Sequence, residues 1–241
     1  GWQKIKLYFM LGLPTETDAD IEAIIALIHK IQKAGNRQLQ INVTLSPFVP
    51  KPFTPFQWCA MQDLVTLLKN ALRIKNAFAK AKNIKIHYHT IENSVLEALL
   101  SRGDIKIAEV IEAAWNNGAH FDGWKECFNF SCWQEAITEC NIALDSYLGA
   151  LNPEDNLPWD FISLSIDKNF LLAEWEKALA GMQTPDCREI CSSCGICNKE
   201  LKTTTAVGIS LKTAPIYQEK KNPSPHDLQF RYRVYYQKTG L

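Results

Sequence analysis

The N-terminal part of the chain alternates between two hydrophobic periodicities. Short apolar or alternating runs, bounded by turn-forming residues, have the pattern of β-strands. Segments between them place apolar residues at the spacing of a helix face. Strand, helix, strand, helix, strand in this order predicts parallel α/β units, with ligands at the C-terminal ends of the strands. The strands are predicted at residues 5–11, 40–45 and 84–89, and the helices at residues 17–35 and about 61–81.

After His89 the pattern becomes helical. Loops with glycine or proline separate segments of helical periodicity near residues 91–101, 104–117, 131–147 and 167–181. A polar stretch then resembles a linker, and alternation resumes at Phe230. We therefore predict five regions. They are an α/β region at residues 1–90, a helical extension at 91–182, a cysteine motif at 183–200, a linker at 201–225 and the start of another domain at 226–241.

Composition and charge narrow the possible partners. The 241 residues include 26 Lys or Arg and 26 Asp or Glu, so the sequence does not indicate a general polyanion binder. No apolar run is long enough to span a bilayer, and no secretory leader is present, so we expect a cytoplasmic protein without a membrane partner. The chain begins at Gly1 and almost immediately enters an apolar run, which we interpret as an internal segment of a longer protein.

Four cysteines lie close together near the C-terminal end. Cys187, Cys191, Cys194 and Cys197 are separated by gaps of three, two and two residues. Thiolates at this spacing suit one soft metal centre, and the short gaps favour an iron–sulfur cluster over zinc. Gly195 would give the backbone room around such a core. The alternatives are strained disulfides or a reduced loop without a ligand.

Two loops after predicted strands are candidates for binding. The turn Gly12-Leu-Pro-Thr-Glu precedes a capped helix whose free N–H groups could hold a carboxylate, a ribose or a base edge. An ordinary strand-to-helix turn would look the same. The loop from Ser46 to Trp58 is rich in proline and aromatic residues. It could wall a pocket, or it could staple the α/β region to the helical extension.

Other polar residues have structural interpretations beside the functional ones. His87 and His89 share a strand face and could bind a metal, although polar positions at a strand end explain them as well. Arg102 and Asp104 lie at a helix junction, as a carboxylate partner and a cap. The tryptophans of the helical extension are expected in the core, and the scattered cysteines are expected to be buried thiols. These residues are Trp115, Trp124, Trp133, Trp159 and Trp175, and Cys59, Cys127, Cys132 and Cys140.

Several segments, in order, resemble one branch of the radical SAM superfamily, whose members often carry an N-terminal cobalamin-binding-like domain. The resemblance covers nearly the whole chain, and its tail resembles the start of the radical SAM-linked domain of unknown function. The segments are Lys6-Leu-Tyr-Phe-Met-Leu-Gly-Leu-Pro-Thr-Glu, Leu45-Ser-Pro-Phe-Val-Pro-Lys-Pro-Phe, Ser94-Val-Leu-Glu-Ala-Leu-Leu-Ser-Arg-Gly-Asp, Gly118-Ala-His-Phe-Asp-Gly-Trp, Leu157-Pro-Trp-Asp, the cysteine run and Phe230-Arg-Tyr-Arg-Val-Tyr-Tyr.

The resemblance implies a fold and a chemistry. The fold would be the C-terminal part of a partial (β/α)6 radical SAM barrel, followed by a helical extension with a four-cysteine motif. A reduced 4Fe-4S cluster would cleave S-adenosylmethionine to a 5′-deoxyadenosyl radical, which abstracts hydrogen from an unknown substrate. An electron donor such as flavodoxin or ferredoxin would reduce the cluster. The implied cofactor-binding residues are Met10, Gly12, Pro14, Glu16, Ser46 and Pro47.

One departure from the superfamily pattern changes the role expected of the cysteines. The superfamily places C-x3-C-x2-C near the first barrel strand, with an aromatic residue before the last cysteine. Here that spacing follows the α/β region, and Ser193 precedes Cys194. We therefore expect the SAM-cleaving motif, and the other half of the barrel, upstream in the same polypeptide. This chain alone would be inactive, and its cysteines would form an accessory site.

Two other functions remain open from the sequence. The cysteines could bind zinc and serve only to hold the helical extension to the next domain. Alternatively, the tail could recognise RNA, because Arg231 and Arg233 lie among Tyr232, Tyr235 and Tyr236, which could stack on bases. The balanced charge makes nucleic acid the weaker of these alternatives.

Overall fold

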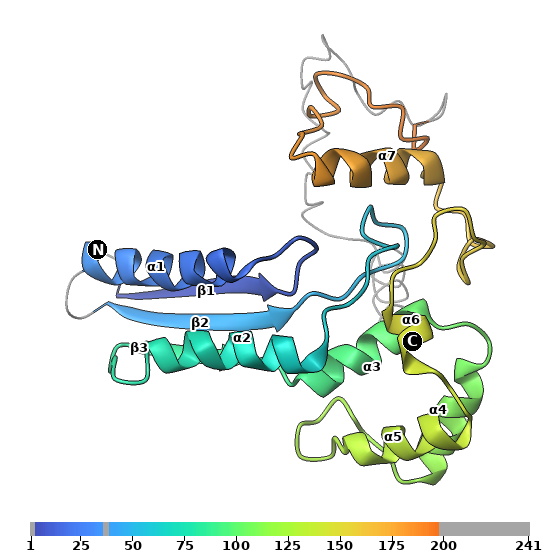
Figure 1. Cartoon of the computed structure of the whole chain (residues 1–241), viewed down its shortest axis with the longest axis horizontal. Coiled ribbons are helices and arrows are strands. Elements are labelled where there is room, and N and C mark those ends of the chain that lie inside the picture. Colours follow the sequence, from blue (N-terminus) through green and yellow to red (C-terminus); the bar gives the residue numbers. More distant parts are fainter. Residues whose placement is uncertain (1–2, 36–38, 198–241) are drawn as a thin grey trace, which may run out of the picture. The chain divides into compact units, whose positions relative to one another are not determined.

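The computed structural model describes residues 3–35 and 39–197 (Figure 1). Within this part of the chain, Pro185–Ser192 belongs to a different compact unit from the residues on either side. The predicted linker at 201–225 and the predicted domain start at 226–241 lie outside the described residues, as do Arg231 and Arg233.

The N-terminal part forms a parallel three-stranded sheet with two helices. β1 covers Lys4–Leu11, α1 Asp18–Ala34, β2 Gln40–Pro47, α2 Leu64–Ala77 and β3 Ile84–Tyr88. The strand order is β1-β2-β3, and both pairings are parallel. The predicted α/β class and the predicted parallel pairing are therefore confirmed.

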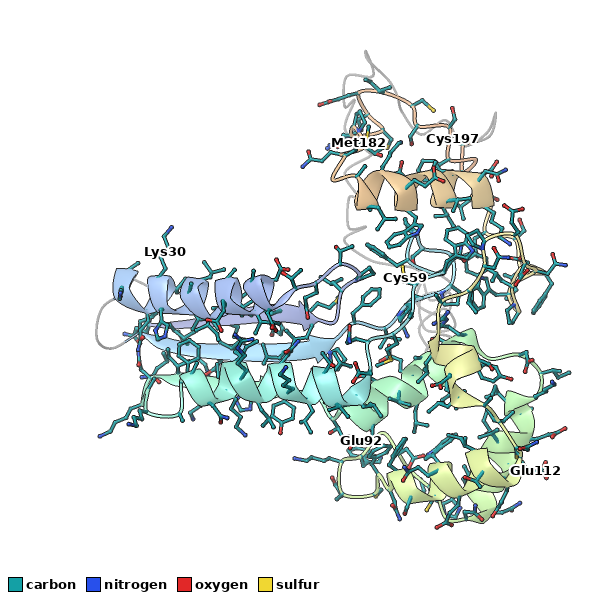
Figure 2. All side chains as sticks on the ribbon, viewed as in Figure 1. Lys30, Cys59, Glu92, Glu112, Met182 and Cys197 are labelled. Atoms are coloured by element: carbon teal, nitrogen blue, oxygen red, sulfur yellow. The ribbon has the colours of Figure 1, made fainter. Side chains whose placement is uncertain are left out.

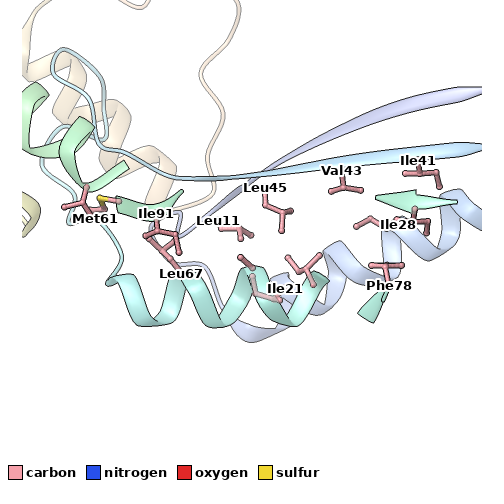
Figure 3. Packing of buried hydrophobic residues seen from close by; sticks show 14 of the residues in the cluster. Leu11, Ile21, Ile28, Ile41, Val43, Leu45, Met61, Leu67, Phe78 and Ile91 are labelled. Carbon is pink, nitrogen blue, oxygen red and sulfur yellow. The ribbon is translucent and has the colours of Figure 1, made fainter. Parts of the chain in front are cut away.

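Both helices pack against the same face of this sheet. Ile41, Val43 and Leu45 of β2 point toward α1 and α2 and share one core cluster with Ile28 and Leu67 (Figure 3). Successive right-handed crossovers produce this arrangement when each new strand is added on the same side, as in the wall of a barrel. The opposite face of the sheet is consequently left without α1 or α2.

Capping residues set the helix boundaries. The Thr17 N–H donates to the Asp20 carboxylate at 2.8 Å at the start of α1, and Gly35 follows its last residue. α2 begins three residues later than the predicted position 61, because the Asp63 carboxylate accepts from the Thr66 N–H at 2.8 Å. These local hydrogen bonds fix how each strand is connected to the following helix.

The chain continues as five helices within the described residues. They are α3 (Ile91–Arg102), α4 (Ile107–Asn116), α5 (Phe130–Glu139), α6 (Leu144–Leu148) and α7 (Lys168–Leu179). The prediction of one helix over residues 131–147 is wrong. The chain breaks between α5 and α6 where Asn141 adopts the left-handed φ of 53°, a conformation that asparagine tolerates.

The aromatic loop after β2 packs on the helical extension. Trp58 is buried with Leu157, Trp159 and Leu171 of α7. The Trp159 indole N–H donates to Gln57 Oε1 at 2.8 Å, and both side chains are buried. Of the two roles predicted for this loop, the structure shows the second: its contacts hold the sheet region to the helical extension. We call this packing of Gln57 and Trp58 against Trp159 the aromatic staple.

The tryptophan and cysteine predictions are only partly correct. Trp133 and Trp159 are buried, whereas Trp115 and Trp124 are 60% and 63% exposed. Cys59 and Cys132 are buried, but Cys127 is exposed and Cys140 is half-buried. Both exposed tryptophans lie at or beyond the end of α4, where the second core cluster, formed by α3, α4 and α5, does not cover them.

Candidate functional site

The sheet face that points away from α1 and α2 carries mostly polar residues. In register, Lys6 of β1 pairs with Asn42 of β2, and Tyr8 pairs with Thr44. Thr44 in turn pairs with His87 of β3. Neighbouring residues in register share a face, so Tyr8, Thr44 and His87 form one row across the sheet. Tyr8 is 70% exposed, which places this row in contact with solvent in the described chain.

A polar face is unusual for a parallel sheet. Parallel strands are normally covered on both faces and read as continuous apolar runs. The strands here instead alternate, and α1 and α2 cover only one side. An open polar face on such a sheet is suited to a ligand, a barrel interior or a partner. The sequence already indicates this face, because Lys, Tyr, Asn, Thr and His alternate with apolar residues along the three strands. Of these residues, only the histidines were predicted as candidates for binding.

Met10 and Ser46 lie together at the C-terminal end of this face. They are register partners, and Leu11 pairs with Pro47 one residue further along. Met10 is 48% exposed, and Ser46 is half-buried. Of the six residues predicted to bind the cofactor, Met10, Ser46 and Pro47 therefore occupy the edge of the sheet where ligands of parallel α/β proteins bind.

A cavity of about 400 Å³ adjoins the turn between β1 and α1. Three of the predicted cofactor residues line it, and Gly12, Ser46 and Pro47 are not among its lining residues. Most of the lining is apolar, with two carboxylates and one threonine. The lining residues are Met10, Leu13, Pro14, Thr15, Glu16, Asp20, Ala23, Ile24 and Leu27.

The Glu16 carboxylate holds the turn in shape. Both of its oxygens accept from the Gly12 N–H at 3.0 Å. Burial raises the pKa of Glu16, and the nearby Asp20 carboxylate adds to the rise. Hydrogen bonds from the Gly12 and Leu13 backbone and from the Asn70 side chain oppose it. Glu16 thus acts first on its own loop, and its effect on a ligand would be indirect.

Gly12 is required by the packing of the turn. Its φ is 82°, and a Cβ at this position would lie 2.8 Å from both Gln62 Cβ and Leu67 Cδ2. The sequence interpretation was that the backbone must approach a ligand here. The close neighbours in the structure are instead side chains beside and within α2, so the glycine is explained without a ligand.

The four-cysteine metal site stays a prediction. Cys187 and Cys191 belong to one compact unit, and Cys194 and Cys197 belong to the other. Cys187, Cys191 and Cys197 are exposed, and Cys194 is half-buried. In residues 3–35 and 39–197, no three His, Cys, Asp or Glu side chains are grouped so that they could hold a metal.

The backbone around Cys194 is held against the start of α7. The Asp167 N–H donates to the Cys194 carbonyl at 2.8 Å. A Cβ on Gly195, whose φ is 88°, would lie 2.8 Å from the Ser165 carbonyl oxygen. Gly195 therefore provides close approach between two backbone segments, whereas the sequence interpretation assigned it to a metal core.

The Arg102–Asp104 junction differs from its prediction. The Arg102 guanidinium donates to the carbonyls of Leu148 and Gly149, at 3.4 and 2.8 Å, and to no carboxylate of the described chain. Asp104 accepts from the Lys106 N–H at 3.0 Å and from the Tyr147 hydroxyl at 3.1 Å. Arg102 therefore ties α3 to the end of α6, and Asp104 shapes the turn before α4.

The described residues form a parallel α/β segment with both helices on one face and one open polar face, and an aromatic loop packs it against a helical extension. Among the helices of the described residues, none has the length and apolar character needed to cross a membrane.

Comparisons with known proteins give one distant likeness. No protein-family model matches the chain, and no solved structure matches it. The chain is similar to an uncharacterized protein of Methanocaldococcus jannaschii, with 28% identity over 164 residues. The similarity covers 68% of this chain and 32% of that protein, so the chain matches about a third of the length of its relative.

Proposed function

We propose that this chain is part of a radical SAM iron–sulfur enzyme that cleaves S-adenosylmethionine reductively and acts on a further substrate. The observation that carries the proposal is the open polar face of the parallel sheet, with Met10 and Ser46 paired at its C-terminal end. Ligands of parallel α/β folds bind at that end, where strand termini and loops meet. The sequence resemblance implies that the cofactor binds at these same strand ends.

The residues at this end suit a nucleoside-containing ligand. The Met10 thioether offers an adaptable apolar surface for a flat ring, and the Ser46 hydroxyl can both donate and accept a hydrogen bond. Glu16 keeps the Gly12–Pro14 loop in one shape by accepting from the Gly12 N–H. S-adenosylmethionine, when bound, supplies the hydrogen-abstraction chemistry, and the protein positions it and excludes water.

The edge of the sheet supports placement of this segment inside a larger barrel. In the described chain β1 is an edge strand, and the cavity beside it exposes Met10, Leu13 and Leu27, at 48%, 38% and 44%. An exposed apolar edge of this kind is normally covered or paired. We place the upstream half of the barrel, which would carry the SAM-cleaving cluster, against β1 and this cavity.

The proposed accessory metal site is formed by Cys187, Cys191, Cys194 and Cys197. Their thiolates suit an iron–sulfur cluster, with zinc as the alternative, and no catalytic step is assigned to them. Anaerobically purified chain carrying a cluster should absorb visible light. Cys191→Ser and Cys194→Ser should remove this absorption, whereas Cys59→Ser and Cys140→Ser should keep it. Colourless protein with about one zinc per chain would establish the alternative.

The test of the enzyme proposal uses the full-length parent protein. After anaerobic reconstitution with iron and sulfide, the parent with dithionite and S-adenosylmethionine should produce 5′-deoxyadenosine. The 241-residue chain treated in the same way should produce none above a protein-free control, because the upstream motif is absent from it. A reconstituted parent that binds iron but releases no 5′-deoxyadenosine would overturn the proposal.

A further inference from the structure

Arg102 at the end of α3 is a buried cation without an anionic partner. Its side chain is only 2% exposed. The two terminal nitrogens donate to the Leu148 and Gly149 carbonyls, but Nε has no hydrogen-bond partner within the described chain. None of the ion pairs formed by the described residues includes Arg102.

A buried guanidinium in this state is energetically expensive. Burial removes water from the guanidinium, which disfavours its charged form and lowers the pKa of Arg102. Cys59 interacts electrostatically with Arg102, but burial raises the pKa of its thiol to about 11, so the thiol stays neutral and supplies no counter-charge. The carbonyls at the end of α6 provide partial charges only. A full negative charge would therefore stabilise this site.

A cavity of about 620 Å³ lies next to this arginine. Its polar lining is rich in hydrogen-bond donors and holds two cations against one carboxylate. That carboxylate, Asp104, already accepts from the Lys106 N–H and the Tyr147 hydroxyl through one oxygen. The break between α5 and α6 forms one wall. The lining residues are Arg102, Asp104, Lys106, Cys140, Asn141, Ile142, Ala143, Ser146, Tyr147, Leu151 and Pro158.

We propose that this cavity binds a small organic anion through its carboxylate or phosphate group, with Arg102 and Lys106 as the pairing cations. A guanidinium recognises either oxyanion with short, charge-assisted hydrogen bonds. Asn141 and Ser146 add neutral donors around the same space. The site shares no lining residue with the cavity beside Gly12, so it does not depend on the radical SAM proposal.

The probes are inorganic phosphate and acetate, titrated calorimetrically into the 241-residue chain at constant ionic strength. We expect at least one to bind with a Kd of about 1 mM or tighter. Tighter binding of phosphate would assign a phosphorylated ligand, and tighter binding of acetate would assign a carboxylate. Absence of heat from both anions would overturn the proposal.

Two charge variants locate the binding. Arg102→Met keeps the volume of the side chain. It should raise the Kd of the anion about tenfold or more, because a charge-assisted hydrogen bond is lost. Lys106→Gln should raise the Kd only about threefold, since this lysine is exposed and water screens its charge. Lys80→Gln, an exposed lysine outside the cavity, is the control and should bind like the wild type.

A steric variant keeps the test decisive if Arg102→Met does not fold. Ala143 is exposed and lines the cavity, so Ala143→Phe should fill it and abolish binding while every charge stays in place. Ala178→Phe on the exposed side of α7 is the matched control and should bind normally. Equal affinity in the wild type and Ala143→Phe would show nonspecific anion binding and overturn the proposal.

Discussion

The sheet region and the helical extension place their polar side chains in opposite ways. Along the sheet, Tyr8, Thr44 and His87 form a row on an open face, where water can solvate them. In the helical extension, Arg102 is buried, and only carbonyl oxygens accept its hydrogen bonds. The first arrangement leaves folding almost unaffected, whereas the second costs free energy that packing must offset.

This difference teaches what each region needs from a ligand. The open face needs no ligand to be stable, because water can solvate its polar side chains. The buried arginine would gain directly from an anion in the neighbouring cavity. Anions added to the isolated chain therefore test the helical extension, and S-adenosylmethionine added to the parent tests the sheet face.

The largest stability effect is expected in the turn that supports the open face. Gly12→Val should destabilise the chain by about 3 kcal/mol, because a branched residue is strained at positive φ and its Cβ would overlap Leu67. Thermal unfolding of the isolated chain measures this loss without any cofactor. Gly123→Ala, where a Cβ would meet nothing within 4 Å, is the control. Equal stability of the two variants would contradict the packing explanation.

The aromatic staple between the two regions should show the next largest effect. Trp159→Phe removes the buried hydrogen bond to Gln57 and should cost about 1–2 kcal/mol. Trp124→Phe changes a side chain that is 63% exposed and should be nearly neutral. Urea unfolding of both variants compares them directly. If Trp159→Phe left the free energy of unfolding unchanged, the buried Trp159–Gln57 contact would not stabilise the packing of the two regions.

A pH-dependent effect is expected from Glu16. Because burial raises its pKa above 4.5 in the folded state, the contribution of Glu16 to stability is present below that pH and is lost as the pH rises through the folded pKa. Glu16→Gln cannot ionise, so it should gain stability relative to the wild type as the pH rises from about 4 to about 7. Urea midpoints across this range test the sign, and a relative loss would contradict it.

The smallest effect is expected from the ion pairs between α1 and α2. Arg73 contacts Asp18 at 3.1 Å and Glu22 at 2.6 Å, and all three side chains are substantially exposed. Arg73→Ala should cost less than about 1 kcal/mol, and added salt should reduce the difference. Lys80→Ala controls for the loss of one positive charge. A salt-independent loss larger than that of Trp159→Phe would reverse the order expected here.

The sequence predicted the sheet region well because its signals are local. The runs at 5–11, 40–45 and 84–89 are strands, Thr17 and Gly35 bound α1, and the parallel pairing follows from the order of elements. The break between α5 and α6 was missed because the apolar periodicity of residues 131–147 continues across Asn141. That break depends on a backbone conformation that the hydrophobic pattern does not encode.

The candidate sites were predictable to different degrees. The alternation along the three strands already contained the open polar face. The buried position of Arg102 could not be predicted, because it depends on carbonyl groups contributed by Leu148 and Gly149, far along the chain. Similarly, the need for glycine at position 12 arises from Gln62 and Leu67, which only the folded chain brings close.

The most direct test of the central claim uses the three methionines of the chain. Met10 lies on the open face, and Met61 is buried. Met182, which follows α7 (Figure 2), is 62% exposed. A methionine-selective oxaziridine label, applied anaerobically to the parent protein, reports the exposure of each thioether. If the open face binds the cofactor, S-adenosylmethionine will protect Met10 and leave the labelling of Met182 and Met61 unchanged. Equal labelling of Met10 with and without S-adenosylmethionine, in a parent protein that binds it, would contradict the account.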